Sequence, residues 1–230
     1  MGQFDADDCL ARYVDLVRRR PSLYTNPLGD IYEILLEPDR IAHAQAEAAR
    51  HRRASGLRND DLRVGVLADD PYVTVTRDAV RFADGSYGLY NRLLVPGGSA
   101  VLPLLGDRIV LLNRFRHGTL AWHLEAPRGA FSGIGTPEDE ARRELLEEIG
   151  ADAGELIPLG QFDSMSGISN ESHHLYLARI EHIGVPDRHE AIVELAALSV
   201  SEMEQKMADS AITDAPTLVL FLRARLHGLL

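Results

Sequence analysis

Apolar side chains recur at helical spacing along the first fifty residues of the chain. They repeat every three or four positions between about Asp7 and His51, and prolines interrupt the pattern. The apolar positions are Leu10, Tyr13, Val14, Val17, Ile31, Ile34 and Leu35, and the prolines are Pro21, Pro27 and Pro38. This pattern predicts two or three helices. The polar stretch that follows, ASGLRNDD, is typical of a linker.

After Leu62 the pattern changes to short runs rich in β-branched and other apolar residues. The runs are VGVL, YVTVT, YNRLLV, AVLPLL and RIVLLNRF, and Asp-Gly, Gly-Gly and Gly-Asp pairs separate them. Such pairs favour tight turns between neighbouring strands. The sequence therefore predicts hairpins and a mixed sheet.

One strong helix is predicted from Pro137 to Ile149, followed by strands around GQFD and HHLYLARI. Later helices are predicted at about Ser201 to Asp209 and Pro216 to Leu226. The strands are segregated from the helices and lack the alternation of a dinucleotide-binding fold. We therefore expect an α/β fold of the α+β type. We expect a helical N-terminal extension at residues 1–60 and a main domain at residues 61–230.

Composition narrows the class of protein. Hydrophobic residues make up 45% and charged residues 26%, which is the balance of an ordinary globular protein. The net charge of −11 argues against nucleic-acid binding, because contacts to phosphates need clustered Lys and Arg. Cys9 is the single cysteine, which excludes an intrachain disulfide and a thiolate metal site. No apolar run has membrane-spanning length and the N-terminus is acidic, so we expect a cytoplasmic protein without membrane contact.

The helix predicted at Pro137 to Ile149 has well-marked ends. Thr136 suits the N-cap, Pro137 the first helical position and Asp139 the acidic position of a capping box. Gly150 suits the position just after the last helical residue. These local signals define the helix from both sides.

Four glutamates crowd one side of this helix. They are Glu140, Glu144, Glu147 and Glu148. Like charges four positions apart repel by a few tenths of a kcal/mol, so the arrangement opposes helix formation unless a positive group neutralises it. Mg²⁺ prefers oxygen ligands and is often shared with substrate phosphates. A divalent cation site is one interpretation, and a solvated acidic face is the other.

The segment from Gly129 to Ala151, GAFSGIGTPEDEARRELLEEIGA, resembles the Nudix box. Its second half, RELLEEIGA from Arg143, follows the family pattern REUxEExGU, in which U is aliphatic or small. Gly129 stands at the first glycine of the box, at the family's spacing from Arg143. One position departs, because the box has a glutamate six residues after that glycine and this sequence has Gly135. In the family that residue is usually a helper rather than a principal metal ligand.

The resemblance extends over roughly Leu62 to Leu226 and favours the ADP-ribose pyrophosphatase-like subgroup. EAPRG, ending at Gly129, resembles that subgroup's strand ending Glu-x-Pro-x-Gly. SMSGISNE resembles its SPGxS-x-E loop with Met165 at the proline, and AITDAPTLVLFLRAR resembles its C-terminal helix. The resemblance implies a Nudix-like α/β/α sandwich with a mixed sheet. It also implies hydrolysis of the pyrophosphate bond of ADP-ribose or a related nucleoside diphosphate sugar, giving a nucleoside monophosphate and a sugar phosphate.

The resemblance also implies a metal site on the helix. Glu144 and Glu148 would be the main Mg²⁺ ligands, with Mn²⁺ as a substitute, and Glu147 would lie beside them. The backbone carbonyl of Arg128 would face the metal cluster. Arg143 would orient the glutamates, or would form an intrahelical ion pair with little catalytic weight.

A carboxylate general base would complete such a site, and the subgroup usually takes it from a loop after the box. Glu190, in DRHEAIVEL, is the first candidate and Glu171 the second. The alternative for each is an exposed loop acid.

Arginines at a predicted strand end are candidates for binding phosphate. Arg114 and Arg116 straddle Phe115 and therefore point to the same side. A guanidinium offers a planar fork for bidentate contacts. By family analogy Arg116 is the better candidate, with a surface ion pair as the alternative. Glu125 would reach the metals, hold a substrate-binding arginine, or form a structural pair.

Three other conspicuous side chains receive a structural interpretation. His173 and His174 are adjacent on a predicted strand and face opposite sides, which argues against a two-histidine metal site. Trp122, the single tryptophan, is expected to pack in the core.

Two other functions stay open. Gly135 and the N-terminal extension are compatible with a non-catalytic Nudix-like module that binds a nucleotide. A pyrophosphatase acting on a dinucleotide or a coenzyme A-type substrate is the other alternative. ADP-ribose-type relatives are commonly homodimers, so we expect a homodimer.

Overall fold

The computed structural model describes residues 5–25, 31–186 and 192–230. The chain forms two compact units, of which the first comprises Met1–Val95 with Gly167–Asn170 and the second Pro96–Ser166 with Glu171–Leu230. The chain of the second unit is therefore interrupted by a short segment that belongs to the first. In the described ranges, no helix combines the length and the apolar character needed to cross a membrane.

The first unit is built on a four-stranded antiparallel sheet with β3 (Thr74–Arg81) at its centre. Strand β4 (Tyr87–Leu94) pairs with β3 over its whole length. Strands β2 (Gly65–Asp69) and β1 (Glu33–Ile34) pair with successive parts of β3 and so share its other edge. A tight turn joins β3 to β4, in which Asp84 accepts a hydrogen bond from the Ser86 N–H at 2.9 Å.

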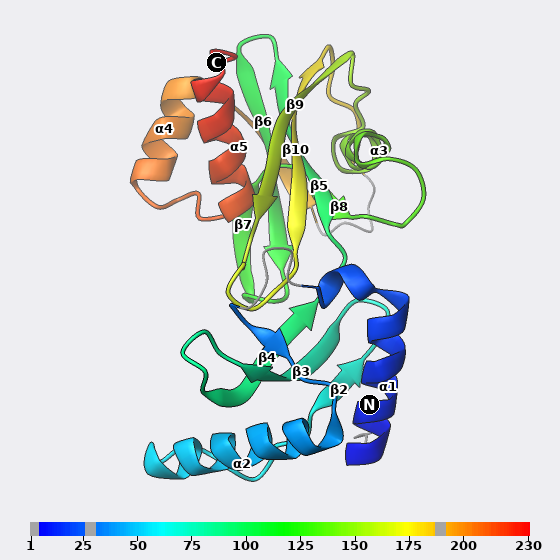
Figure 1. The fold of residues 1–230 in the computed structure, drawn as a ribbon. Coiled ribbons are helices and arrows are strands. Elements are labelled where there is room, and N and C mark those ends of the chain that lie inside the picture. The colour runs from blue at the N-terminus through cyan, green and yellow to red at the C-terminus, as the bar shows by residue number, and fades with distance from the viewer. Residues whose placement is uncertain (1–4, 26–30, 187–191) are drawn as a thin grey trace. The chain divides into compact units, whose positions relative to one another are not determined.

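Two helices cover the apolar surfaces of this sheet, and Figure 1 shows them as α1 and α2. Helix α1 (Ala6–Arg19) buries Cys9, Tyr13 and Leu16, while α2 (Pro38–Ala54) buries Ile41 and a row of alanines. A short 3₁₀ helix, η1 (Pro21–Leu23), follows α1. The helical spacing of these residues places them on one side of each helix. Helix α1 packs against β2, and α2 packs against β3 and β4.

A buried carboxylate ties α1 to the sheet. The Tyr13 hydroxyl donates to Asp78 Oδ1 at 2.5 Å, and Arg92 Nε lies 2.5 Å from Asp78 Oδ2. The Arg92 guanidinium also lies 4.6 Å from the centre of the Tyr24 ring. Burial and the neighbouring Asp78 charge raise the pKa of Tyr13, so its hydroxyl stays protonated as a donor.

The four inserted residues extend the edge of β4. The Leu93 N–H donates to the Ile168 carbonyl at 2.8 Å, and the Tyr90 hydroxyl donates to the Gly167 carbonyl at 2.5 Å. The Val95 N–H donates to the Asn170 side chain at 2.9 Å. These hydrogen bonds explain why the segment belongs to the first unit although the second unit flanks it in sequence.

The second unit contains a mixed sheet of seven strands. Its main order is β11 (Ile192–Leu198), β6 (Arg108–Arg116), β5 (Gly98–Leu105), β10 (Ser172–Ile180) and β9 (Glu155–Asp163). Strand β7 (Ala121–Glu125) pairs with β6, and β8 (Arg128–Ala130) pairs with β5. The β5 and β10 pair is parallel, whereas the other pairs of this sheet are antiparallel.

Helices cover both faces of this sheet (Figure 1). Helix α3 (Pro137–Ile149) packs on one face, with Leu145 and Ile149 fully buried against Val101 and Val110. Helices α4 (Val200–Ala208) and α5 (Ala215–Leu226) contribute to the apolar cluster on the other face. The expected α/β/α sandwich with a mixed sheet is confirmed, and the late helices begin and end within one residue of their predicted limits.

The structure divides the chain at a different place from the expected boundary between residues 60 and 61. The two or three helices expected in this region are present as α1, the short η1 and α2, but β2, β3 and β4 join them in the first unit. The physical reason is burial. Helices α1 and α2 have apolar sides that need a sheet to cover them, and the strands that follow the linker supply it.

Candidate active site

Helix α3 presents buried carboxylates beside its apolar side. Its ends match the expected signals, because Thr136 and Asp139 form a capping box and Gly150 has a left-handed conformation with φ +68°. Ala141, Leu145 and Ile149 face the sheet. Glu140, Glu144 and Glu148 follow at intervals of four, and their exposed fractions are only 2%, 5% and 1%. The crowded acidic side is therefore turned inward, and the interpretation as a solvated acidic face is wrong.

Gly129 on β8 lies directly against the Glu144 carboxylate. A Cβ atom at this position would overlap Glu144 Oε1 and Cδ and would lie 2.7 Å from Oε2. Any side chain there would displace the carboxylate. The glycine that opens the box motif thus provides the space in which Glu144 sits.

Glu148 is held by main chain and side chain together. The Arg128 N–H donates to Glu148 Oε2 at 3.0 Å, and Arg114 Nη1 contacts Glu148 Oε1. Charge-assisted hydrogen bonds of this kind fix a carboxylate in both position and orientation. Arg128 therefore contacts Glu148 through its backbone N–H, whereas the expectation for this residue concerned its carbonyl.

Arg143 lies among the glutamates of its own helix. Its guanidinium contacts Glu140, Glu144 and Glu147. These hydrogen bonds raise the pKa of Arg143, so it stays charged. Glu147 is more exposed than the other three, with 38% of its side chain accessible. Glu140 had no predicted role of its own at the metal site, although its spacing of four from Glu144 was the available signal.

Burial, followed by the charge of Glu148, raises the pKa of Glu144 from 4.5 to about 8. Arg143 opposes this shift but does not cancel it. Two buried carboxylates in one place are thus electrostatically unfavourable when both are ionised. A cation placed between them would relieve that repulsion.

A second charged cluster surrounds Glu125, which is completely buried. Arg116 binds it in bidentate fashion, through Nε at 3.0 Å and also through Nη2. Arg128 Nη2 lies 3.7 Å from Glu125 Oε2 and donates to Asp214 Oδ1 at 2.9 Å. Glu125 thus holds an arginine, which agrees both with its reading as the anchor of a substrate-binding arginine and with its reading as a structural pair. Asp214, which also caps α5 by accepting from the Thr217 N–H at 3.1 Å, was missed in the sequence.

Of the two candidate general bases, the structure describes only Glu171. Glu171 accepts a hydrogen bond from the Ser164 hydroxyl, and its Oε1 lies 3.4 Å from His173 Nε2. His173 above all, and Ser164, lower the pKa of Glu171 to about 2 against the effect of burial. Such a carboxylate is a weak proton acceptor at neutral pH. Glu190 lies outside the described residues.

Gly135, the departure from the box motif, has φ +81°. A side chain there would be strained, and its Cβ would lie 3.0 Å from Asp139 Oδ2. Asp139 in turn accepts from the Thr136 N–H at 2.8 Å. The loop before α3 is therefore adapted to glycine at this position.

The remaining conspicuous side chains divide as follows. His173 is buried, while His174 contacts the Gln161 amide at 3.1 Å, so the two face different surroundings. The expectation for Trp122 is wrong, because 53% of it is exposed and its ring lies 5.5 Å from the Phe115 ring. Both rings lie near the hairpin end of β6 and β7, where Phe115 and Trp122 are directly opposite each other.

The residues around α3 have the chemistry of a divalent-cation site. They offer carboxylate oxygens with no thiolate or imidazole among them, which suits Mg²⁺ or Mn²⁺. As the side chains stand in the described ranges, no three acidic, His or Cys groups converge on one point. Arg114 and Arg143 contact oxygen atoms of Glu148 and Glu144. A bound cation would take over oxygens that these arginines now hold.

Comparison with known proteins assigns the family. Residues 96–219 match the family model of the NUDIX domain. The chain belongs to the Nudix family. The match begins at the first residue of the second unit and contains the whole box, whereas Met1–Val95 of the first unit precede it.

Relatives of this Nudix chain include pyrophosphatases of nucleotide compounds. It is 30% identical over 148 residues to the ADP-ribose pyrophosphatase of Mycobacterium tuberculosis, a match covering 60% of this chain and 70% of the relative. It is 28% identical over 155 residues to the GDP-mannose pyrophosphatase of Yersinia enterocolitica, covering 62% and 73%. A solved structure described as an ADP compounds hydrolase shares the fold with a TM-score of 0.63 at 19% identity, covering 71% of this chain and 91% of that one. The chain is a Nudix-type pyrophosphohydrolase.

Proposed function

We propose that this Nudix hydrolase cleaves the pyrophosphate bond of ADP-ribose or a related nucleoside diphosphate sugar with the help of Mg²⁺. The products are a nucleoside monophosphate and a sugar phosphate. The observation that carries the proposal is the buried pair of Glu144 and Glu148, held opposite a glycine that leaves room for one of the carboxylates. The substrates named for the relatives in Mycobacterium tuberculosis and Yersinia enterocolitica support the choice of substrate class.

A pyrophosphate resists attack because its oxygens are negatively charged. Bound Mg²⁺, or Mn²⁺ in its place, would neutralise that charge and lower the pKa of the attacking water. In this chain Glu144 and Glu148 would hold the ion, with Glu147 and the Arg128 carbonyl beside them. Arg143 would keep the glutamates in position through the contacts it already makes.

Arginine side chains beside the glutamates would bind the substrate phosphates. Arg114 contacts Glu148 and Arg116 is held by the buried Glu125, so both guanidiniums are anchored on the side of the sheet where α3 lies. An arginine fixed by a carboxylate loses little further side-chain entropy when it binds phosphate. Glu125 is thus a positioning residue in this scheme.

The general base is proposed to be Glu190, with Glu171 as the second candidate. The hydrogen bonds that hold Glu171 favour its ionised form, which reduces its ability to take a proton at neutral pH. They suit a carboxylate that orients a neighbouring group better than one that accepts a proton.

The test is incubation with ADP-ribose, with and without Mg²⁺, with products analysed by chromatography and phosphate NMR. We expect metal-dependent release of AMP and ribose 5-phosphate. Glu148→Gln should lower kcat by about 10³-fold, because it removes a charge at the point where the transition state needs it. Glu138→Gln on the same helix is the matched control, since Glu138 pairs with Arg142 at the exposed surface, and it should change kcat less than twofold.

The same assay decides between the alternatives. A product from a dinucleotide or a coenzyme A-type compound, with none from ADP-ribose, would mean that the protein is a pyrophosphatase with a different substrate. No product from any of these, with nucleotide-dependent thermal stabilisation, would favour a binding module, as the glycine at Gly135 suggests. We further propose that the protein acts as a homodimer in the cytoplasm, which light scattering and cell fractionation test.

A further inference from the structure

A pocket of about 400 Å³ lies in the first unit, between α2 and the hairpin of β3 and β4. It precedes the matched Nudix region and none of the residues assigned to hydrolysis lines it. Pockets that hold small organic ligands typically have volumes of about 300–1,000 Å³. The site is therefore large enough for a ligand of its own.

One part of the pocket is apolar and contains an aromatic ring. Phe82 lies directly on Gly88, because a Cβ at Gly88 would be 2.7 Å from the edge of the ring. Tyr32 packs against Phe82 with ring centres 5.6 Å apart, which fixes the ring. Ala48 and Leu89 complete this part. A planar ring is the ligand group that fits such a surface.

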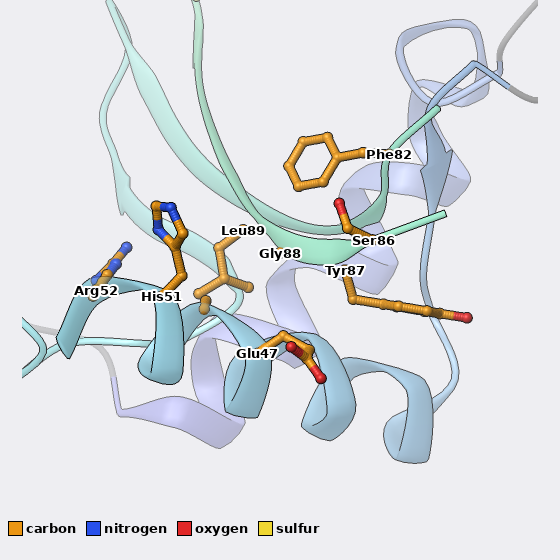
Figure 2. A pocket seen from close by; sticks show the side chains of 9 residues that line it. Glu47, His51, Arg52, Phe82, Ser86, Tyr87, Gly88 and Leu89 are labelled. Carbon is orange, nitrogen blue, oxygen red and sulfur yellow. The ribbon is translucent and has the colours of Figure 1, made fainter. Parts of the chain in front are cut away.

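The other part of the pocket is positively charged. Figure 2 shows His51 and Arg52 projecting from α2 toward the side on which the Phe82 ring lies. Among the described residues, Arg52 makes one hydrogen bond, from Nη1 to the Asp61 carbonyl at 3.0 Å, which leaves Nη2 for a ligand. The acid of the pocket, Glu47, is already paired with Arg50. The unmatched charge therefore favours an anion.

Polar main chain forms a third part of the pocket. Strand β4 pairs with β3 on one side, and within the described ranges its other side is bridged only at Leu93. Of the strands that the structure describes, none pairs with the outer edge of β4 at Tyr87–Leu89, and these residues line the pocket. An unpaired edge offers alternating N–H and C=O groups, which match the donors and acceptors on the edge of a nucleobase.

We propose that this pocket binds a nucleoside monophosphate. The base would lie on Phe82 with its edge toward β4, and the phosphate would contact Arg52 and His51. This binding does not depend on the hydrolysis proposed above, although that reaction would release a molecule of this class.

The test is a titration of the full chain, labelled with ¹⁵N, with AMP, adenosine and inorganic phosphate in the presence of EDTA. We expect AMP to shift the amide signals of Ser86, Gly88 and Leu89. Adenosine and phosphate should each bind at least tenfold more weakly than AMP at these signals, because each offers half of the contacts. Equal affinities for all three would overturn the proposal.

Substitutions separate specific binding from general charge attraction. His51→Gln and Arg52→Gln should each raise the dissociation constant for AMP about tenfold. Arg53→Gln removes the same charge as Arg52→Gln from the exposed end of the same helix but does not line the pocket, and it should change the constant less than twofold. His51 is exposed, so its variant will fold even if that of Arg52 does not.

Two results would contradict the proposal. One is an equal loss of AMP affinity in Arg53→Gln and His51→Gln. The other is a set of AMP-induced shifts confined to residues 96–166 and 171–230, which would place all binding in the Nudix unit. The hydrolase proposal is tested separately from this one. Glu148→Gln should remove hydrolysis, whereas AMP should still shift the amide signals of Gly88 and Leu89 in that variant.

Discussion

Gly129→Ala is the sharpest test of the geometry around Glu144. The added Cβ overlaps Glu144 Oε1 and Cδ, and Oε2 at 2.7 Å must itself retreat by 3.4 − 2.7 = 0.7 Å to reach ordinary contact. The carboxylate as a whole therefore moves by about 1 Å. A displacement of that size at a reacting centre costs about 10²-fold in rate. We expect kcat/KM for ADP-ribose to fall by about 10²-fold, or about 2.7 kcal/mol in transition-state stabilisation.

The assay compares initial rates at saturating Mg²⁺ with those of Gly118→Ala. Gly118 lies in the turn between β6 and β7, and a Cβ there meets no atom within 4 Å. That control should keep kcat/KM within twofold of the parent. Thermal unfolding of both variants sets a temperature at which each is folded. An activity of Gly129→Ala within threefold of the parent would refute the reasoning, because the displaced carboxylate would then have no part in the reaction.

Three further outcomes are expected. Glu190→Gln should lower kcat far more than KM. An unchanged kcat would show that Glu190 is not the general base and would leave Glu171 as the candidate. The pKa of Glu144 is raised above its ordinary value of 4.5 to about 8, so its contribution to stability is greatest below pH 4.5 and is lost as the pH rises through 8. The melting temperature in EDTA should therefore fall as the pH rises over that range, and Mg²⁺ should restore it most strongly near pH 8. Glu144→Gln should show neither effect. Tyr13→Phe leaves one oxygen of buried Asp78 without its donor and should lower the free energy of unfolding by about 1–3 kcal/mol, measured by urea denaturation.

Local signals in the sequence predicted local structure well. Thr136, Asp139 and Gly150 define α3 because capping depends on a few adjacent residues, and the structure shows each of them in its predicted role. The inward crowding of glutamates on α3 followed from spacing and family resemblance together. The pairing of Arg128 with Asp214 joins residues 86 positions apart, and no pattern along the chain indicates it.

The division into units and the surroundings of Trp122 could not be predicted either, because both depend on how segments pair in three dimensions and not on a pattern along the chain. The run of strands after Leu62 looks continuous in sequence, and only the three-dimensional pairing shows that β2, β3 and β4 form one sheet and β5 begins another. Trp122 is apolar enough to suggest a core position. It lies near the hairpin end of β6 and β7, and the pattern along the strand does not indicate which side chains stay uncovered there.

The segment Gly167–Asn170 joins the two units in a way that a single linker would not. The polypeptide passes between the units after Val95, after Ser166 and after Asn170, so each unit is completed by chain that returns from the other. Glu171 follows directly on Asn170, whose side chain is fastened to the Val95 N–H. Asn170 is therefore bonded to the end of β4 in the first unit, and the next residue along the backbone, Glu171, already belongs to the Nudix unit. The backbone therefore crosses between the two units three times, and no single cleavage separates all residues of one unit from those of the other.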